Sequence, residues 1–93
     1  MQTFLKSSAP HNIKEAATLL LQDEVVAIPT ETVYGLAASA LSDAAVRKIF
    51  AAKGRPQDNP LISHIASLAM LPMIASNVPQ SAYLLAKAFW PGP

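Results

Sequence analysis

Apolar residues in the first third of the chain follow a helical period and then form a short continuous run. Positions i, i+3, i+4, i+7 and i+8 of residues 13–21 are apolar, which predicts one face of an amphipathic helix. Residues 25–28 are apolar without interruption, which predicts a strand covered on both faces. A short edge strand is expected at residues 3–5. The predicted apolar helix face comprises Ile13, Ala16, Ala17, Leu20 and Leu21.

The middle of the chain predicts a second strand followed by a second helix. Residues 36–41 are small and apolar, which is consistent with a strand. Ser42 and Asp43 are favourable N-cap residues for the helix that follows. Gly54 stands in the position where glycine commonly ends a helix. The buried face of this helix is predicted to comprise Val46, Ile49 and Phe50.

The last third predicts one more strand and two helices. Residues 61–65 follow a proline and are predicted to form another strand, with Leu61, Ser63 and Ile65 on one face. A short helix is expected over residues 67–74, and a longer one begins near Pro79, a residue suited to a first helical turn. Helices that alternate with strands indicate an α/β fold. The apolar face of the last helix is predicted to comprise Ala82, Leu85, Ala86 and Phe89.

Composition narrows the class of protein. The chain has 93 residues, enough for one domain at most, and 52% of them are hydrophobic. Only 14% are charged, which suggests that part of the apolar surface is covered by something further. The net charge of +1 gives no strong field toward nucleic acid or membranes, and the lack of cysteine excludes disulfides and thiolate metal sites. Neither a signal peptide nor an apolar run of roughly 20 residues is present, so a cytoplasmic protein is expected.

Polar side chains follow the first predicted strand. Thr30, Glu31 and Thr32 come at its carboxyl end, where open α/β sheets usually bind ligands. They are equally consistent with a capped turn, because threonine and glutamate also satisfy local backbone groups. Gly35 allows a turn or a close approach to the backbone. Glu31 and Asp58 could hold a magnesium ion, but two isolated carboxylates are weak evidence for one.

Two cations flank a glycine just after the second predicted helix. Lys53 and Arg55 suit a phosphate or a carboxylate, and the guanidinium can bind either through two hydrogen bonds. The alternative is a solvated helix end, where cations complement the helix dipole. His64 lies alone on the strand predicted at residues 61–65, where a single histidine is more often structural than functional, and Asn59 could simply shape a turn. The chain has no P-loop, dinucleotide fingerprint or catalytic triad motif.

Four linked motifs give a more specific signal. Residues 29–36 (PTETVYGL), 53–56 (KGRP), 59–61 (NPL) with His64, and 90–93 (WPGP) resemble the YrdC-like family of L-threonylcarbamoyladenylate synthases. The resemblance extends from about residue 10 to the last residue. It implies an α/β fold with a twisted open mixed sheet and flanking helices, built around a concave cationic cavity. Because the family domain is considerably longer, the resemblance also implies that residues 1–93 form a partial domain, truncated at its C-terminal side.

The resemblance implies an enzymatic activity. Family members are nucleotidyltransferases that combine L-threonine, bicarbonate and ATP into threonylcarbamoyl-AMP and release pyrophosphate. A Mg²⁺ ion on the triphosphate is expected. Downstream tRNA-modifying proteins then pass the threonylcarbamoyl group to an adenosine of tRNA, so tRNA is a further possible partner.

The family's site residues carry over onto five positions of this chain. Thr32 and His64 would contact threonine, while Arg55 and Asn59 would contact ATP. Lys53 and Arg55 would be catalytic, because cations reduce the repulsion between the carbamate and the α-phosphate. Three alternatives stay open: an RNA-binding module, including one for double-stranded RNA, a carbamoyl-handling domain of a larger enzyme, and an inactive truncated fragment.

Overall fold

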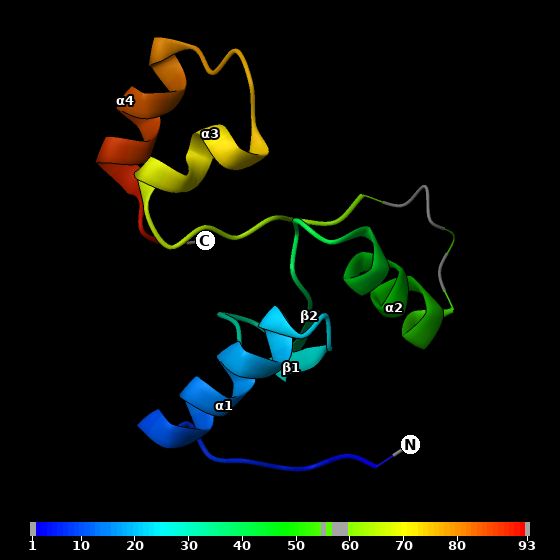
Figure 1. Cartoon of the computed structure of the whole chain (residues 1–93). Coiled ribbons are helices and arrows are strands. Elements are labelled where there is room, and N and C mark those ends of the chain that lie inside the picture. Colours follow the sequence, from blue (N-terminus) through cyan, green and yellow to red (C-terminus); the bar gives the residue numbers. More distant parts are fainter. Residues whose placement is uncertain (1, 55, 57–59, 93) are drawn as a thin grey trace. The chain divides into compact units, whose positions relative to one another are not determined.

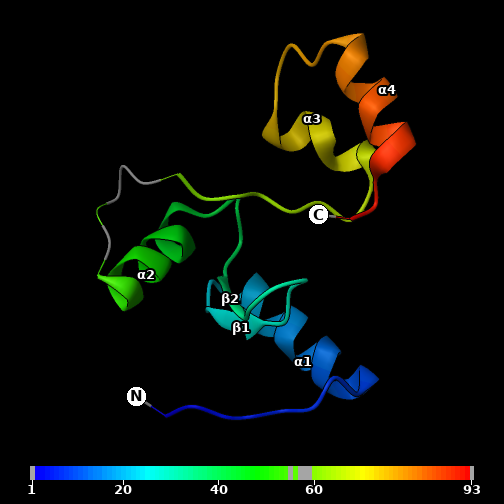
Figure 2. The same cartoon turned by 180° about the vertical axis from the view of Figure 1, so that it is seen from behind.

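The computed structural model describes residues 2–54, 56 and 60–92, and these residues form two compact units. The first unit is Met1–Pro60 and the second is Leu61–Pro93. Figures 1 and 2 show a small sheet with helices in the first unit and only helices in the second. None of the helices in the described residues is both long and apolar enough to span a membrane.

The first unit is built on an antiparallel pair of strands. Its elements are α1 (Pro10–Leu21), β1 (Val26–Ile28), β2 (Gly35–Ala37) and α2 (Asp43–Lys53). The register pairs Val26 with Ala37, Ala27 with Leu36 and Ile28 with Gly35. Residues 29–34 therefore form the loop of a hairpin, and this loop carries the PTETVY part of the first motif.

The predicted first helix is confirmed, but its apolar face is only partly covered. Ala16 and Leu20 are half-buried, while Ile13 and Leu21 are exposed. After the helix, Asp23 has a left-handed backbone with φ 61°, and its N–H donates to the carbonyl of Leu20 at 3.2 Å. This geometry ends the helix and satisfies one of its last carbonyl groups.

Both strands are present, with two corrections. Val26 and Ile28 are half-buried whereas Ala27 is exposed, so the expectation of a strand covered on both faces is wrong. The strand instead has the alternating pattern of an antiparallel sheet with one open face. The second strand ends at Ala37, although the apolar run predicted a strand over residues 36–41.

Helix α2 confirms the sequence-based prediction at both ends and on its buried face. The N–H of Ala45 donates to the Ser42 hydroxyl oxygen at 3.2 Å, which makes Ser42 the N-cap. Gly54 ends the helix with φ 65°, a left-handed conformation that glycine adopts without steric cost. Ala45, Ile49 and Phe50 are buried, and Val46 is half-buried.

We expect the substitution Ser42→Ala to lower the free energy of unfolding by about 1 kcal/mol, because it removes the side-chain acceptor for the Ala45 N–H. Ser42→Asp is the matched control, since a carboxylate at the N-cap accepts the same bond. Urea unfolding of the 93-residue chain measures both variants. Equal losses in the two variants would show that the cap does not contribute.

The second unit is helical. It contains the 3₁₀ turn η1 (Leu68–Met70), α3 (Leu71–Ile74) and α4 (Gln80–Phe89). Within this unit Ala86 is buried, while Leu85 and Phe89 on the predicted apolar face of α4 are exposed. The two predicted helices are therefore present, and α4 begins directly after Pro79 as expected.

Two predicted strands are wrong. Residues 61–65 and residues 3–5 are extended or irregular and are not paired with any strand among the described residues. An apolar run becomes a strand only when a neighbour supplies the ladder hydrogen bonds. The described part of the chain therefore holds a two-stranded sheet, and the two further strands expected from the sequence are absent from it.

Candidate functional site

Thr32 lies at the tip of the β1–β2 loop, as the sequence predicted for a residue that follows the first strand. Its side chain is exposed, and its hydroxyl makes no hydrogen bond with any residue that the structure describes. Thr30 is different: its hydroxyl donates to the Val33 carbonyl and accepts from the Thr32 backbone N–H at 3.3 Å. The capped-turn interpretation is therefore confirmed for Thr30, whereas Thr32 keeps its hydroxyl for another partner.

The position of the loop differs from the expectation in one respect. The rule that ligands bind at the carboxyl ends of strands describes parallel sheets, but β1 and β2 are antiparallel.

Gly35 is the first residue of β2 and pairs with Ile28. A Cβ atom at Gly35 would lie 3.5 Å from Thr30 Cγ2, an ordinary van der Waals distance. Neither a turn nor a close backbone approach within the described chain therefore requires glycine there.

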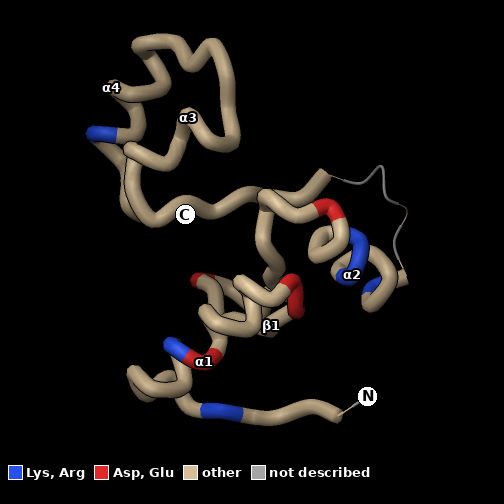
Figure 3. Tube along the Cα trace, in the orientation of Figure 1, with Lys and Arg blue, Asp and Glu red and all other residues tan. Residues whose placement is uncertain are grey.

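Lys53 is the last residue of α2, directly before the Gly54 cap. Its side chain is exposed at the C-terminal end of the helix, where a cation complements the dipole. Figure 3 shows basic residues in blue along α2, whose sequence also contains Arg47 and Lys48. Lys48 forms a half-exposed ion pair with Glu24 at 3.4 Å, which contributes little to stability.

Of the other three predicted site residues, the structure describes one, His64. Arg55 and Asn59 lie outside the described residues. His64 is exposed in the irregular segment that begins the second unit, whereas Thr32 and Lys53 belong to the first unit. The prediction that His64 lies on a strand is wrong because residues 61–65 have no pairing partner among the described residues.

The described residues offer no built metal site. They contain no group of three or more carboxylate or imidazole side chains that could hold an ion. Glu31 is exposed in the β1–β2 loop, and Asp58, the second predicted carboxylate, lies outside the described residues. A pair of protein ligands for magnesium is therefore not assembled by the part of the chain that is described.

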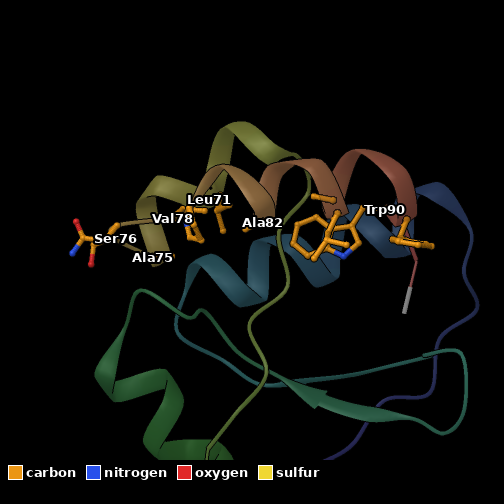
Figure 4. A pocket seen from close by; sticks show the side chains of 11 residues that line it. Leu71, Ala75, Ser76, Val78, Ala82 and Trp90 are labelled. Carbon is orange, nitrogen blue, oxygen red and sulfur yellow. The ribbon is translucent and has the colours of Figure 1, made fainter.

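The second unit contains an apolar groove that the sequence did not predict. The groove has a volume of about 560 Å³ and lies between α3, the following link and α4 (Figure 4). The spacing of α4 indicated an apolar face but not that this face would stay open. None of the residues that line the groove is charged. Its lining residues are Leu71, Ala75, Ser76, Asn77, Val78, Pro79, Ala82, Leu85, Ala86, Phe89 and Trp90.

Sequence comparison identifies the family. The model of the Sua5/YciO/YrdC family, described as "Telomere recombination", matches residues 18–93, and the chain belongs to this family. The threonylcarbamoyl-AMP synthase of Pyrococcus abyssi is 57% identical over 81 residues, which are 87% of this chain and 24% of that protein. The Bacillus subtilis threonylcarbamoyl-AMP synthase is 56% identical over 80 residues, or 86% of this chain and 23% of that protein.

A solved structure supports the fold. The crystal structure of P. abyssi Sua5 complexed with L-threonine matches with a TM-score of 0.86 and 52% identity. The match covers 94% of this chain and 26% of that chain. The α/β fold expected from the sequence is therefore confirmed, and the chain spans about a quarter of the length of these relatives.

Proposed function

We propose that this chain supplies the threonine-binding part of a threonylcarbamoyl-AMP synthase. The observation that carries the proposal is the likeness to P. abyssi Sua5, a protein crystallised with L-threonine, at 52% identity over nearly the whole chain. The free hydroxyl of Thr32 in the β1–β2 loop, unbonded within the described residues, is available to a small polar ligand. His64 is the second proposed contact to threonine.

The proposed reaction proceeds in two steps. The amino nitrogen of L-threonine adds to the carbon of bicarbonate with loss of water, which gives a carbamate. A carbamate oxygen then attacks the α-phosphorus of ATP, the bond from this phosphorus to the bridging oxygen breaks, and pyrophosphate leaves with the electron pair. The product is threonylcarbamoyl-AMP, and atoms and charge balance without a redox partner.

The second step brings two anions together, and this defines the proposed roles of the cations. Lys53 and Arg55 neutralise the carbamate and the phosphates, which lowers the repulsion in the transition state. Asn59 and Arg55 are proposed to hold ATP. A single exposed cation at the end of α2 has little effect in water, so the site must be shielded from solvent before Lys53 acts strongly.

Magnesium is proposed to enter with ATP as part of the substrate. Mg²⁺ keeps several waters and is commonly held by substrate phosphates with one or two carboxylates. Glu31 and Asp58 are the candidates for a carboxylate that helps to hold the ion.

The proposed function is tested with two chains. One is the 93-residue chain, and the other is a chimaera in which this chain is followed by the part of the P. abyssi synthase beyond the matched region. Each is incubated with L-threonine, labelled bicarbonate, Mg²⁺ and ATP, and threonylcarbamoyl-AMP is measured by mass spectrometry. We expect the chimaera to form product. Calorimetry should detect binding of threonine to the chimaera and to the 93-residue chain. A chimaera that folds but neither binds threonine nor forms product would refute the proposal.

The wider pathway stays a prediction from the resemblance. A cytoplasmic location, transfer of the product by tRNA-modifying proteins and contact with tRNA are all proposed on that basis. Direct binding of double-stranded RNA is expected to be weak, because the net charge is only +1. An inactive fragment is the alternative that the same assay decides, since it predicts a 93-residue chain without threonine affinity.

A further inference from the structure

The side chain of Thr30 is fixed by three neighbours in the β1–β2 loop. Its hydroxyl donates to the Val33 carbonyl and accepts from the Thr32 N–H at 3.3 Å. Its methyl group faces Gly35, where an added Cβ would lie 3.5 Å from Thr30 Cγ2. The Thr30 hydroxyl thus bonds to the backbone N–H of Thr32 and to the backbone carbonyl of Val33. The Thr30 methyl group lies beside Gly35, the first residue of β2.

The hydrogen bonds separate the roles of the two threonines. A hydroxyl has one proton to donate, and Thr30 uses it on the Val33 carbonyl. Thr30 therefore cannot also donate to a ligand while the loop keeps this conformation. The Thr32 hydroxyl has no partner among the described residues and keeps its proton for a ligand. Thr30 therefore shapes the loop, whereas the Thr32 hydroxyl is available to bind a ligand.

We propose that Thr30 is a positioning residue that orients Thr32 toward the L-threonine substrate. This inference rests on the proposed function of Thr32. The loop is exposed and has no buried side chain to hold it, so its conformation depends on such local hydrogen bonds. Loss of the hydroxyl frees the Thr32 N–H and the Val33 carbonyl to bond with water, and the loop then samples conformations that point Thr32 elsewhere.

Two substitutions at Thr30 isolate the hydroxyl. Thr30→Val keeps the shape and the methyl contact with Gly35 but removes both hydrogen bonds. Thr30→Ser keeps the hydroxyl and loses the methyl. We expect Thr30→Val to raise the dissociation constant for L-threonine by about 5-fold to 20-fold, the effect of one or two net hydrogen bonds, and Thr30→Ser to change it less than about twofold.

The measurements distinguish positioning from general stability. Calorimetry gives the threonine affinity, and the chimaera gives KM for threonine and for ATP. Positioning predicts a raised KM for threonine in Thr30→Val with unchanged KM for ATP and an unchanged urea midpoint. Normal threonine affinity in Thr30→Val overturns the inference. Parallel losses of threonine affinity, ATP affinity and stability overturn it as well, because they indicate a purely structural role.

Failure of the proposed role of Thr32 can be distinguished from failure of the inference about Thr30. Thr32→Val should abolish threonine binding, and normal binding in this variant shows that Thr32 is not a contact, whatever Thr30 does. The orienting contact is also measured without ligand, from the amide resonance of Thr32 in ¹H–¹⁵N spectra of the 93-residue chain. That resonance should shift in Thr30→Val and stay in Thr30→Ser; an unshifted resonance in Thr30→Val overturns the inference.

Discussion

Replacing Arg55 by alanine is expected to lower threonylcarbamoyl-AMP formation by roughly 10³-fold or more, which corresponds to about 4 kcal/mol of transition-state stabilisation. The reason is electrostatic. An anionic carbamate must approach an anionic α-phosphate, and a guanidinium can neutralise both while it binds phosphate oxygens in a bidentate way. The measurement is product formation by the chimaera under saturating threonine, bicarbonate and ATP, with kcat/KM for ATP determined separately.

Two controls make the result specific to Arg55. Arg47→Ala removes the same charge from an exposed position on α2 and should leave turnover within about twofold, because the field of a solvent-exposed charge is screened by salt. Arg55→Lys keeps the charge but loses the planar fork of donors, so its activity should fall between those of the alanine variant and the wild type. Near-normal turnover of Arg55→Ala would remove Arg55 from the proposed mechanism.

Helices were predictable from the sequence because their determinants are local. The helical spacing of Val46, Ile49 and Phe50 (i, i+3, i+4), the Ser42 cap and the C-terminal Gly54 all act within α2 itself, and the structure confirms each of them. The same holds for the start of α4 after Pro79. Side-chain burial was less predictable, since Leu85 on the expected apolar face of α4 remains exposed.

Strands were less predictable because pairing is not local. Residues 26–28 form a strand since the hairpin brings β2 beside them, but the predicted strand at residues 61–65 has no partner among the described residues. A strand-like sequence does not by itself supply the neighbour with which a strand must pair. The antiparallel register was also not predicted, because nothing in the apolar run specifies the direction of its neighbour.

The candidate site was partly predictable for a related reason. Thr32 was expected beside a strand end, and Lys53 beside a helix end, because sequence position alone fixes these neighbours. The two hydrogen bonds of Thr30 were not specifically predicted, because the sequence is compatible with a capped turn but does not specify which backbone groups a hydroxyl in it bonds. The open groove beside α4 depends on where α3 and the link lie.

The core residue Phe50 is expected to dominate the stability of the first unit. Phe50 is 5% exposed and shares the small core of this unit with Ala45 and Ile49. Phe50→Ala should lower the free energy of unfolding by about 3–5 kcal/mol, because the apolar ring is lost and a cavity remains. A small domain has only a few kcal/mol of stability in total, so most of the variant should be unfolded in water. Urea unfolding followed by circular dichroism measures the loss.

Phe89→Ala is the matched control, because the same side chain is removed from a position that is 73% exposed. It should change the free energy of unfolding by no more than about 0.5 kcal/mol. The comparison also bears on function, since α2 ends at Lys53, two residues before Arg55 in the sequence. If Phe50 anchors α2, threonine affinity should fall together with helicity in Phe50→Ala and stay unchanged in Phe89→Ala. Equal stability of the two variants would mean that burial of Phe50 contributes little, and the positioning of the α2 cations would then need another source.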